Sequence, residues 1–408
     1  MKLRVRTEQL DDARPLLDLS PTDDAVAWVR DGQGMVGWGT AVRIDPGPGL
    51  DRFAAADASL RRLAADAEVV DPIQLPGSGL VGIGSFTFDA HAAGSVLVVP
   101  RVVVGRRDAT TWLTTIDPVG ADPVPGPATD PPRQPVRDRP RYAGSSKPDL
   151  RWLEAVAAAI ERIETSELAK VVLARDHAVW SHEPFDALDL ARRLTARFPR
   201  CHTFVVDGLV GATPELLLAR TGDRVVSRVL AGTTGRSDDE AEDAALGAAL
   251  LASDKDRQEH VHAADSVHRV LEPWCDELVH DDRPRLLRLD NVQHLATSFE
   301  GRLRAPRSSL EIVAALHPTA AVGGTPRDAA LATIAELEGM DRGRYAAPVG
   351  WTNPSGDGEW GIALRCAQLS GARARLFAGG GIVAASLPED ELQETRLKLL
   401  AMQAVLDA

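Results

Sequence analysis

The sequence predicts an α+β fold, with antiparallel strands at the centre and amphipathic helices packed outside them. Short segments that alternate apolar and polar residues recur between glycines, which is typical of antiparallel strands. Other segments carry apolar residues every three to four positions, which is the period of a helix. Two early segments, GMVGWGTAVRID and GLVGIGSFTFD, also resemble each other and predict two similarly built strands.

Composition and charge exclude several classes of protein. The 408 residues are 44% hydrophobic and 26% charged, as in ordinary folded domains. The net charge of -13 argues against nucleic-acid or anionic-membrane partners, because both need a basic surface. No segment approaches the ~20 apolar residues of a membrane span, and the amino terminus has no signal-like apolar core. Without a CxxC pair, the three cysteines indicate neither a disulfide framework nor a zinc ribbon. We therefore expect a cytoplasmic protein.

The first 117 residues predict a sheet region with little chemistry. A strand is expected at residues 25–29, a helix at 51–67 and two valine-rich strands within 95–116. Nine prolines between residues 118 and 148 predict an irregular surface connection. We therefore divide the chain into an N-terminal sheet region (1–117), a connection (118–148) and a chemically rich region (149–408), with one shared core.

Two glycine patterns, Gly32 to Gly37 and Gly77 to Gly82, match the dinucleotide-binding spacing GxGxxG. That fingerprint needs a strand before it and a helix after it. Both matches instead run into alternating, strand-like residues. The context favours glycine-containing strands over a nucleotide site.

Two charged residues in the central part of the chain are candidates for proton transfer. Lys170 begins an apolar strand that follows a helix starting near Pro148. It is either a lysine at a sheet edge or, if buried, a base with a lowered pKa. Glu215 lies between two strands in the turn GATPE. It is either a hairpin charge or, with a raised pKa, a general acid.

A predicted helix at residues 253–271 carries further polar groups. Helical spacing places Asp256, Glu259 and His260 on one face. His260, His262 and His268 leave a zinc site as an alternative, although their spacing is not that of HExxH.

The segment 378–400 combines a glycine-rich turn with a charged helix. Helical spacing places Glu391, Glu394 and Lys398 side by side. The turn Gly379–Gly381 would let backbone N–H groups approach an anion closely. Two carboxylates near such a cradle suggest a metal ion, and a solvated charged face is the alternative.

Residues 150–400 contain nine segments that occur in one order in a known family. The chain resembles the chorismate-utilising enzymes of menaquinone, siderophore and tryptophan biosynthesis through the segments ELAKVVLAR, GATPELLL, LAGTTGR, SDKDRQEHV, VQHLATSFEG, HPTAAVGGTPRDAA, RYAAPVGW, ALRCA and AGGGIVAASLPEDELQET.

This resemblance implies a single domain built on two antiparallel sheets with helices outside. It implies one Mg²⁺, bound through Glu259 and Glu394 with Asp256 and Glu391 in support. It also implies that chorismate is the substrate. The residues expected to contact it are Ala231, Gly232, Thr233, His294, Thr319, Tyr345, Arg365, Gly379, Gly380 and Lys398.

Within the family, the isochorismate synthases match best. Water-adding members share Lys170, aminodeoxychorismate synthases carry a lysine where this chain has Ala231, and the loop with Ala321 and Val322 is closest to isochorismate synthases. The resemblance implies that Lys170, neutral in an apolar wall, is the general base and that Glu215 is the general acid. A salicylate synthase and a noncatalytic binding relative remain alternatives. We expect a monomer, working in either menaquinone or siderophore synthesis.

Overall fold

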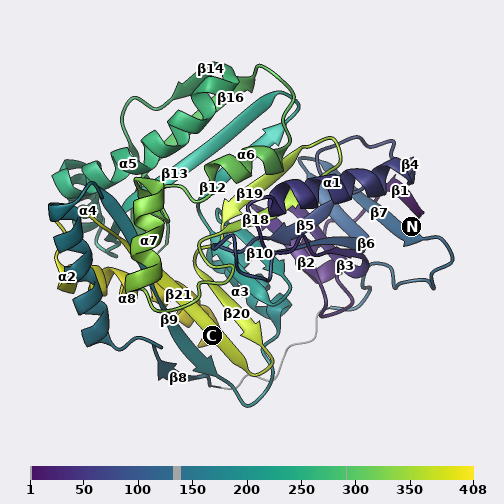
Figure 1. Cartoon of the computed structure of the whole chain (residues 1–408). Coiled ribbons are helices and arrows are strands. Elements are labelled where there is room, and N and C mark those ends of the chain that lie inside the picture. The colour runs from purple at the N-terminus through teal and green to yellow at the C-terminus, as the bar shows by residue number, and fades with distance from the viewer. Residues whose placement is uncertain (1, 132–138, 291) are drawn as a thin grey trace.

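All strands of the described part of the chain belong to one network of hydrogen-bonded pairings, and helices lie around it (Figure 1). The computed structural model describes residues 2–131, 139–290 and 292–408. Residues 132–138 of the predicted proline-rich connection therefore lie outside the described residues. Every pairing is antiparallel except that of β1 with β4. This agrees with the predicted α+β class.

The network has two arms that meet at β6 (Val96–Arg107). Val98 and Leu97 of β6 pair with β3 on one side and with β5 on the other. The longer arm contains, in spatial order, β4 (Glu68–Val70), β1 (Leu3–Gln9), β7 (Thr110–Pro118), β6, β3 (Gln33–Ile44), β2 (Val26–Arg30), β10 (His202–Val206), β11 (Leu209–Thr213), β20 (Cys366–Ser370), β21 (Arg373–Ile382) and β9 (Lys170–Trp180), with β8 (Arg141–Gly144) and β17 (Gly324–Thr325) on β9.

The second arm runs from β6 through the middle of the chain. It contains β5 (Gly82–Ser85), β18 (Pro348–Thr352), β19 (Gly358–Ile362), β12 (Leu216–Thr221), β13 (Arg224–Gly235) and β16 (Val292–Leu303), which pairs with β14 (Cys275–His280) and β15 (Arg285–Arg288). The two predicted sheets correspond to these two arms, but the arms are joined at β6, so hydrogen bonds link all the described strands.

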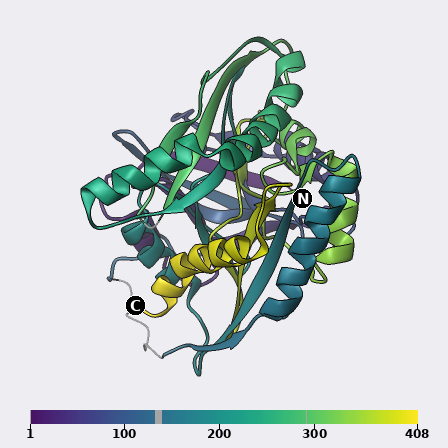
Figure 2. The same ribbon diagram turned by 90° about the vertical axis from the view of Figure 1, so that its left-hand side faces the viewer.

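The helices cover the outside of both arms. α2 (Asp149–Thr165), α7 (Arg327–Leu337) and α8 (Pro388–Leu406) pack on β9 and β21, and α1 (Arg52–Ala65) packs on α6 (Ser309–Leu316). α8 runs beside α2 in Figure 2. The remaining helices are α3 (Ala187–Arg197), α4 (Glu240–Ala252) and α5 (Asp254–Leu271), with short 3₁₀ turns at Leu16–Leu19 and Glu272–Trp274. In the described ranges no helix is both long and apolar enough to cross a bilayer.

The two glycine patterns that match a nucleotide fingerprint lie in or beside strands. Gly34 and Gly37 belong to β3, and Gly82 opens β5. Neither pattern leads into a helix. The structure thus agrees with the strand interpretation.

One buried ion pair joins α7 to the sheet and to the loop before it. Arg342 donates to both carboxylate oxygens of Glu338 at 2.7 Å, and the backbone N–H of Ala174 in β9 donates to the same carboxylate at 2.8 Å. Arg342 also donates to the carbonyl oxygens of Val322 (2.9 Å) and Val172 (2.7 Å). Both side chains of the pair are almost fully buried.

Replacing Glu338 with alanine should leave the Arg342 guanidinium buried without its carboxylate. We expect the free energy of unfolding, measured by urea denaturation, to fall by about 3–5 kcal/mol. Glu336→Ala is the control, because Glu336 lies on the same helix but is exposed. A Glu338→Ala variant as stable as the control would show that the pair contributes little.

Candidate active site

A cavity of about 70 Å³ lies between β9, β13, β16, β21, α5 and α8. Most of the residues predicted for the site line it. These are Glu215, Ala231, Gly232, Thr233, Glu259, His294, Tyr345, Arg365, Gly379 and Lys398. Segments separated by almost two hundred residues in the sequence therefore meet at one place.

Glu215 supplies a buried carboxyl group to the cavity. It lies between β11 and β12, as the sequence predicted, and only 3% of it is exposed. Burial raises the pKa of its carboxyl to about 8, although the charges of Lys170 and Lys398 partly oppose this. The group therefore carries a proton near neutral pH and can donate it.

Lys170 lies directly behind the cavity wall, at the start of β9. It is fully buried, and its Nζ atom lies 3.1 Å from Oε1 of Glu259 without hydrogen-bond geometry. Burial would raise the pKa of Glu259, but Lys170 and Lys398 bring that pKa below its usual value. The expected apolar wall is therefore interrupted at Glu259, whose carboxylate faces the lysine.

The predicted glycine-rich turn is instead part of a strand. Gly379–Gly381 belong to β21 and pair with residues 172–174 of β9. A Cβ atom on Gly381 would lie 2.0 Å from Oε1 of Glu259, and one on Gly380 would lie 2.8 Å from Oε2 of Glu391. These glycines are therefore needed because helix carboxylates approach the strand closely, and not because the backbone turns.

His294 connects the two sides of the cavity. Nη2 of Arg365 lies 3.2 Å from Nε2 of His294, and Oγ1 of Thr233 lies 3.1 Å from Nδ1. Arginine can only donate, so Nε2 accepts and Nδ1 carries the proton. Burial and the Arg365 charge hold the pKa of His294 well below its usual value. The imidazole is therefore neutral, and it accepts a hydrogen bond from Arg365.

Irregular backbone aims the side chains of this group. The register of β13 and β16 shifts between Ala231 and Thr233, at Gly232, whose φ is +77°. Arg365 (φ +48°) and Ala346 (φ +59°) also adopt the left-handed conformation, although neither is glycine. Such residues cluster at functional sites. Arg365 lies just before β20.

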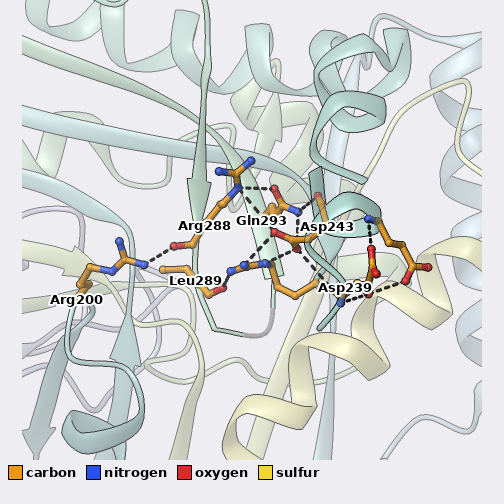
Figure 3. A network of polar contacts seen from close by, with 9 residues as sticks. Arg200, Asp239, Asp243, Arg288, Leu289 and Gln293 are labelled. Atoms are coloured by element: carbon orange, nitrogen blue, oxygen red, sulfur yellow. Dashed lines mark hydrogen bonds and ion pairs between the residues drawn. The ribbon is translucent and has the colours of Figure 1, made fainter. Parts of the chain in front are cut away.

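A polar network supports the beginning of β16, next to His294 (Figure 3). Gln293 donates to the carbonyl oxygen of Asp243 at 2.9 Å and to its carboxylate at 3.0 Å. The same carboxylate accepts from Arg236 at 2.6 Å and 3.0 Å. Arg200 donates to the carbonyl oxygen of Arg288 at 2.9 Å. The contacts of Gln293 and Asp243 hold α4 against the start of β16. They therefore fix the position of the backbone that carries His294.

The acidic residues of α5 and α8 lie next to the cavity. Burial and the Glu394 carboxylate raise the pKa of Glu391 to about 7, and burial together with Glu259 raises the pKa of Asp256. Oε2 of Glu391 is buried without a hydrogen-bond partner in the described structure. Lys255 donates to the other oxygen of Glu391 at 2.6 Å.

These carboxylates fit a hard divalent cation. Their oxygens suit Mg²⁺, which keeps several waters and takes one or two protein carboxylates. In the described ranges no group of three or more histidine, cysteine, aspartate or glutamate side chains is arranged to hold a metal by itself. A cation here would thus depend on water or substrate oxygens as well as on the protein.

Some predicted residues lie outside the cavity lining. Thr319 is buried in the loop before β17, and Gly380, Asp256, Glu391 and Glu394 lie behind the wall. Glu394 accepts from Lys398 at 2.5 Å, and Lys398 also donates to the carbonyl oxygen of Gly379 at 2.8 Å.

The sequence analysis missed two charged residues at the site, Arg342 in the wall and Lys255 on Glu391. Neither lies at a position that helical or strand periodicity marks. Lys255 directly precedes Asp256 in the segment SDKDRQEHV, from which the candidate metal ligands were chosen. That segment was therefore the signal that could have identified Lys255 as a site residue.

The zinc alternative finds no support in the positions of the histidines. His260 uses both ring nitrogens, with Nδ1 3.2 Å from the carbonyl oxygen of Ala231 and Nε2 2.7 Å from Oγ1 of Thr297. His268 stacks edge-on against His280. His260 therefore joins α5 to β13 and β16.

The chain is similar in sequence to chorismate-binding enzymes, including several isochorismate synthases. Residues 127–407 match the family described as "Chorismate binding enzyme". The "Salicylate biosynthesis isochorismate synthase" of Pseudomonas aeruginosa is 36% identical over 98% of this chain and 89% of its own length. "Isochorismate synthase DhbC" of Bacillus subtilis is 42% identical over 62% of this chain and 66% of its own length.

A solved structure shares the whole fold. The menaquinone-specific isochorismate synthase MenF of Escherichia coli superimposes with a TM-score of 0.81 at 26% identity, covering 99% of this chain and 94% of the MenF chain.

The Glu215 carboxyl makes stability depend on pH. Its pKa is about 8 in the folded protein and 4.5 in an ordinary carboxyl, so folding retains a proton between these values. The wild type should therefore lose stability as pH rises from about 5 to 8. Glu215→Gln should escape this loss and gain up to roughly 4 kcal/mol relative to the wild type over that range.

Urea unfolding at pH 5.5 and pH 8.5 measures this difference. Glu336→Gln serves as control, because that carboxylate is exposed. If Glu215→Gln and the wild type show parallel pH profiles, Glu215 titrates as an ordinary carboxyl.

Proposed function

The chain belongs to the chorismate-binding enzyme family, and from this membership we infer that it is an isochorismate synthase, an isomerase that converts chorismate to isochorismate. Homologues that carry this name at 36% and 42% identity support the inference. The observation that carries the chemistry is the protonated Glu215 on a cavity that Glu259 also lines, with Lys170 buried behind the wall next to Glu259. An acid and a base at one cavity are what this isomerisation needs.

We propose that the reaction proceeds by two proton transfers. Lys170 acts in its neutral form, after losing its own proton, and takes a proton from a water molecule as that water adds to ring C2. Glu215 gives its proton to the C4 hydroxyl, which leaves as water while the ring double bond shifts. One water enters and one leaves, so the substrate and product are isomers. General acid and base catalysis contribute about 10²- to 10⁴-fold each.

The remaining lining residues would hold the substrate. Arg365 and Tyr345 would bind the enolpyruvyl carboxylate, and the neutral His294 would lie beside the ring. Thr233 accepts the Nδ1 proton of His294, so its own hydroxyl proton is free to bind a substrate oxygen. Ala231, Gly232, Thr319, Gly379, Gly380 and Lys398 complete the proposed substrate contacts.

Mg²⁺ is the proposed cofactor, held by Glu259 and Glu394 with Asp256 and Glu391 in support. When bound, it would supply positive charge for the ring carboxylate. A cytoplasmic monomer and the division of the chain at residues 117 and 148 remain predictions from the sequence, as does a role in menaquinone or siderophore synthesis.

Incubation of the purified protein with chorismate tests the activity. We expect isochorismate with Mg²⁺ and none after EDTA, as identified by chromatography of the ring products. Salicylate as the main product would assign the chain to the salicylate synthases. Unchanged chorismate under both conditions would favour a noncatalytic binding relative.

Removing the proposed base should slow water addition, and urea unfolding of each variant checks that the fold survives the loss of the lysine beside Glu259. We expect kcat of Lys170→Ala, and of the bulkier Lys170→Met, to fall by about 10²- to 10⁴-fold while chorismate binding persists. Lys147→Met is the control, because Lys147 donates to the carbonyl oxygen of Leu337 and pairs with none of the carboxylates at the site. Turnover at the wild-type rate in either Lys170 variant would exclude Lys170 as the base.

A further inference from the structure

A second and larger hollow lies beside the active-site cavity. It has a volume of about 780 Å³, within the range of small-molecule sites. Its walls come from α1, the loop after β5, the end of α6 and the length of α7. Figure 1 shows α1 and α6 next to each other there. The N-terminal region, through α1 and the loop after β5, and the catalytic part of the chain thus both contribute to it.

Arg52 places a positive charge in this hollow, and the exposed carboxylate of Asp89 acts on it from beyond ion-pair distance. The residue is 3% exposed, and in the described ranges no carboxylate lies at ion-pair distance from it. It donates to the carbonyl oxygens of Gly49 (3.1 Å) and Thr87 (3.2 Å), and it lies 4.5 Å over the ring of Phe53. Its Nε–H is buried without an acceptor. A buried guanidinium in this state lacks an anion.

His317 adds a hydrogen-bond acceptor next to this charge. Its Nε2 lies 3.2 Å from the carbonyl oxygen of Phe88, so Nε2 carries the proton. Nδ1 is then a lone pair, and it is buried without a partner. The rings of Phe53 and Phe88 lie edge-on to the imidazole, at 6.3 Å and 5.7 Å. The floor of the hollow is therefore aromatic as well as cationic.

Charged groups of both signs line the rest of the hollow. Asp89, Asp328 and Asp341 line the hollow and are exposed, so they form its rim. Glu338 also lines it, but its charge is compensated by Arg342. A ligand with one anionic group can place that group on the floor. A second anionic group would meet three carboxylates and one guanidinium, that of Arg327, at the rim, and this balance of charge disfavours a dicarboxylate such as chorismate.

We propose that this hollow binds a small aromatic monocarboxylate. Its carboxylate lies on Arg52 and its ring lies between Phe53, Phe88 and the apolar side chains of Leu331 and Ile334. A hydroxyl group on the ring, where present, donates to Nδ1 of His317.

Arg342 couples this hollow to the active site. It lines both cavities, and its ring contact with Phe88 is 4.1 Å. The same guanidinium donates to the carbonyl oxygens of Val172 and Val322, which both line the active-site cavity. A ligand in the hollow therefore contacts Arg342. Through the hydrogen bonds of Arg342, it shifts Val172 and Val322 in the wall of the active-site cavity.

Isothermal titration with benzoate, on the full chain in EDTA, tests the binding without relying on the proposed activity. We expect one site, weakened about tenfold or more in Arg52→Met and in Ala335→Trp, which fills the rim. Arg61→Met and Ala332→Trp should bind as the wild type does. Arg61 is an exposed arginine of the same helix, and Ala332 is an exposed alanine of α7 outside the lining.

The active-site variant Arg365→Met distinguishes the two cavities, and it should retain benzoate binding. Loss of binding in Arg365→Met alone would place benzoate in the active-site cavity and overturn the proposal. Equal affinity in every variant, or no binding at all, would also overturn it. For the coupling, benzoate should change kcat or KM for chorismate in the wild type but not in Ala335→Trp, and equal effects in both would refute it.

Discussion

Buried ion pairing is the constraint on which the site depends. Charged groups removed from water are costly unless they are paired. Lysines and glutamates from β9, α5 and α8 satisfy one another where these elements meet, so none of the three can shift without leaving a charge unpaired. The pairs that join elements are Lys170–Glu259 at 3.1 Å and Lys255–Glu391 at 2.6 Å, and Lys398–Glu394 at 2.5 Å is a further pair within α8. The same pairing holds the carboxylates near one another, which is the arrangement that a cation requires.

Space for this cluster comes from residues without side chains and from unusual backbone. Gly379–Gly381 remove Cβ atoms from the strand that the glutamates approach. Gly232 interrupts the pairing of β13 and β16 so that Thr233 faces His294. Left-handed Arg365 and Ala346 complete the wall. The backbone is irregular at the site, whereas the surrounding sheet keeps regular strand geometry.

Much of the fold and site was predictable because periodicity and motifs report local structure. The helices at 149–165 and 254–271 and the position of Glu215 between two strands agree with the predictions. The role of Gly379–Gly381 was misjudged because a glycine run looks alike in a turn and in a crowded strand. The partner of Lys170 was not predictable, since Glu259 lies 89 positions away and only the fold brings them together. Arg342 was not predicted as a site residue, because only the fold brings it next to the cavity.

The branch at β6 bears on how the chain can be dissected. The segment that matches the family begins at residue 127, yet β10 pairs with β2 and β18 pairs with β5, both of which precede it. A fragment trimmed to the matched residues would expose two bare strand edges with unpaired N–H and C=O groups. Such edges recruit strands from other molecules. The N-terminal strands thus act as a built-in guard against aggregation for the part of the chain that carries the chemistry.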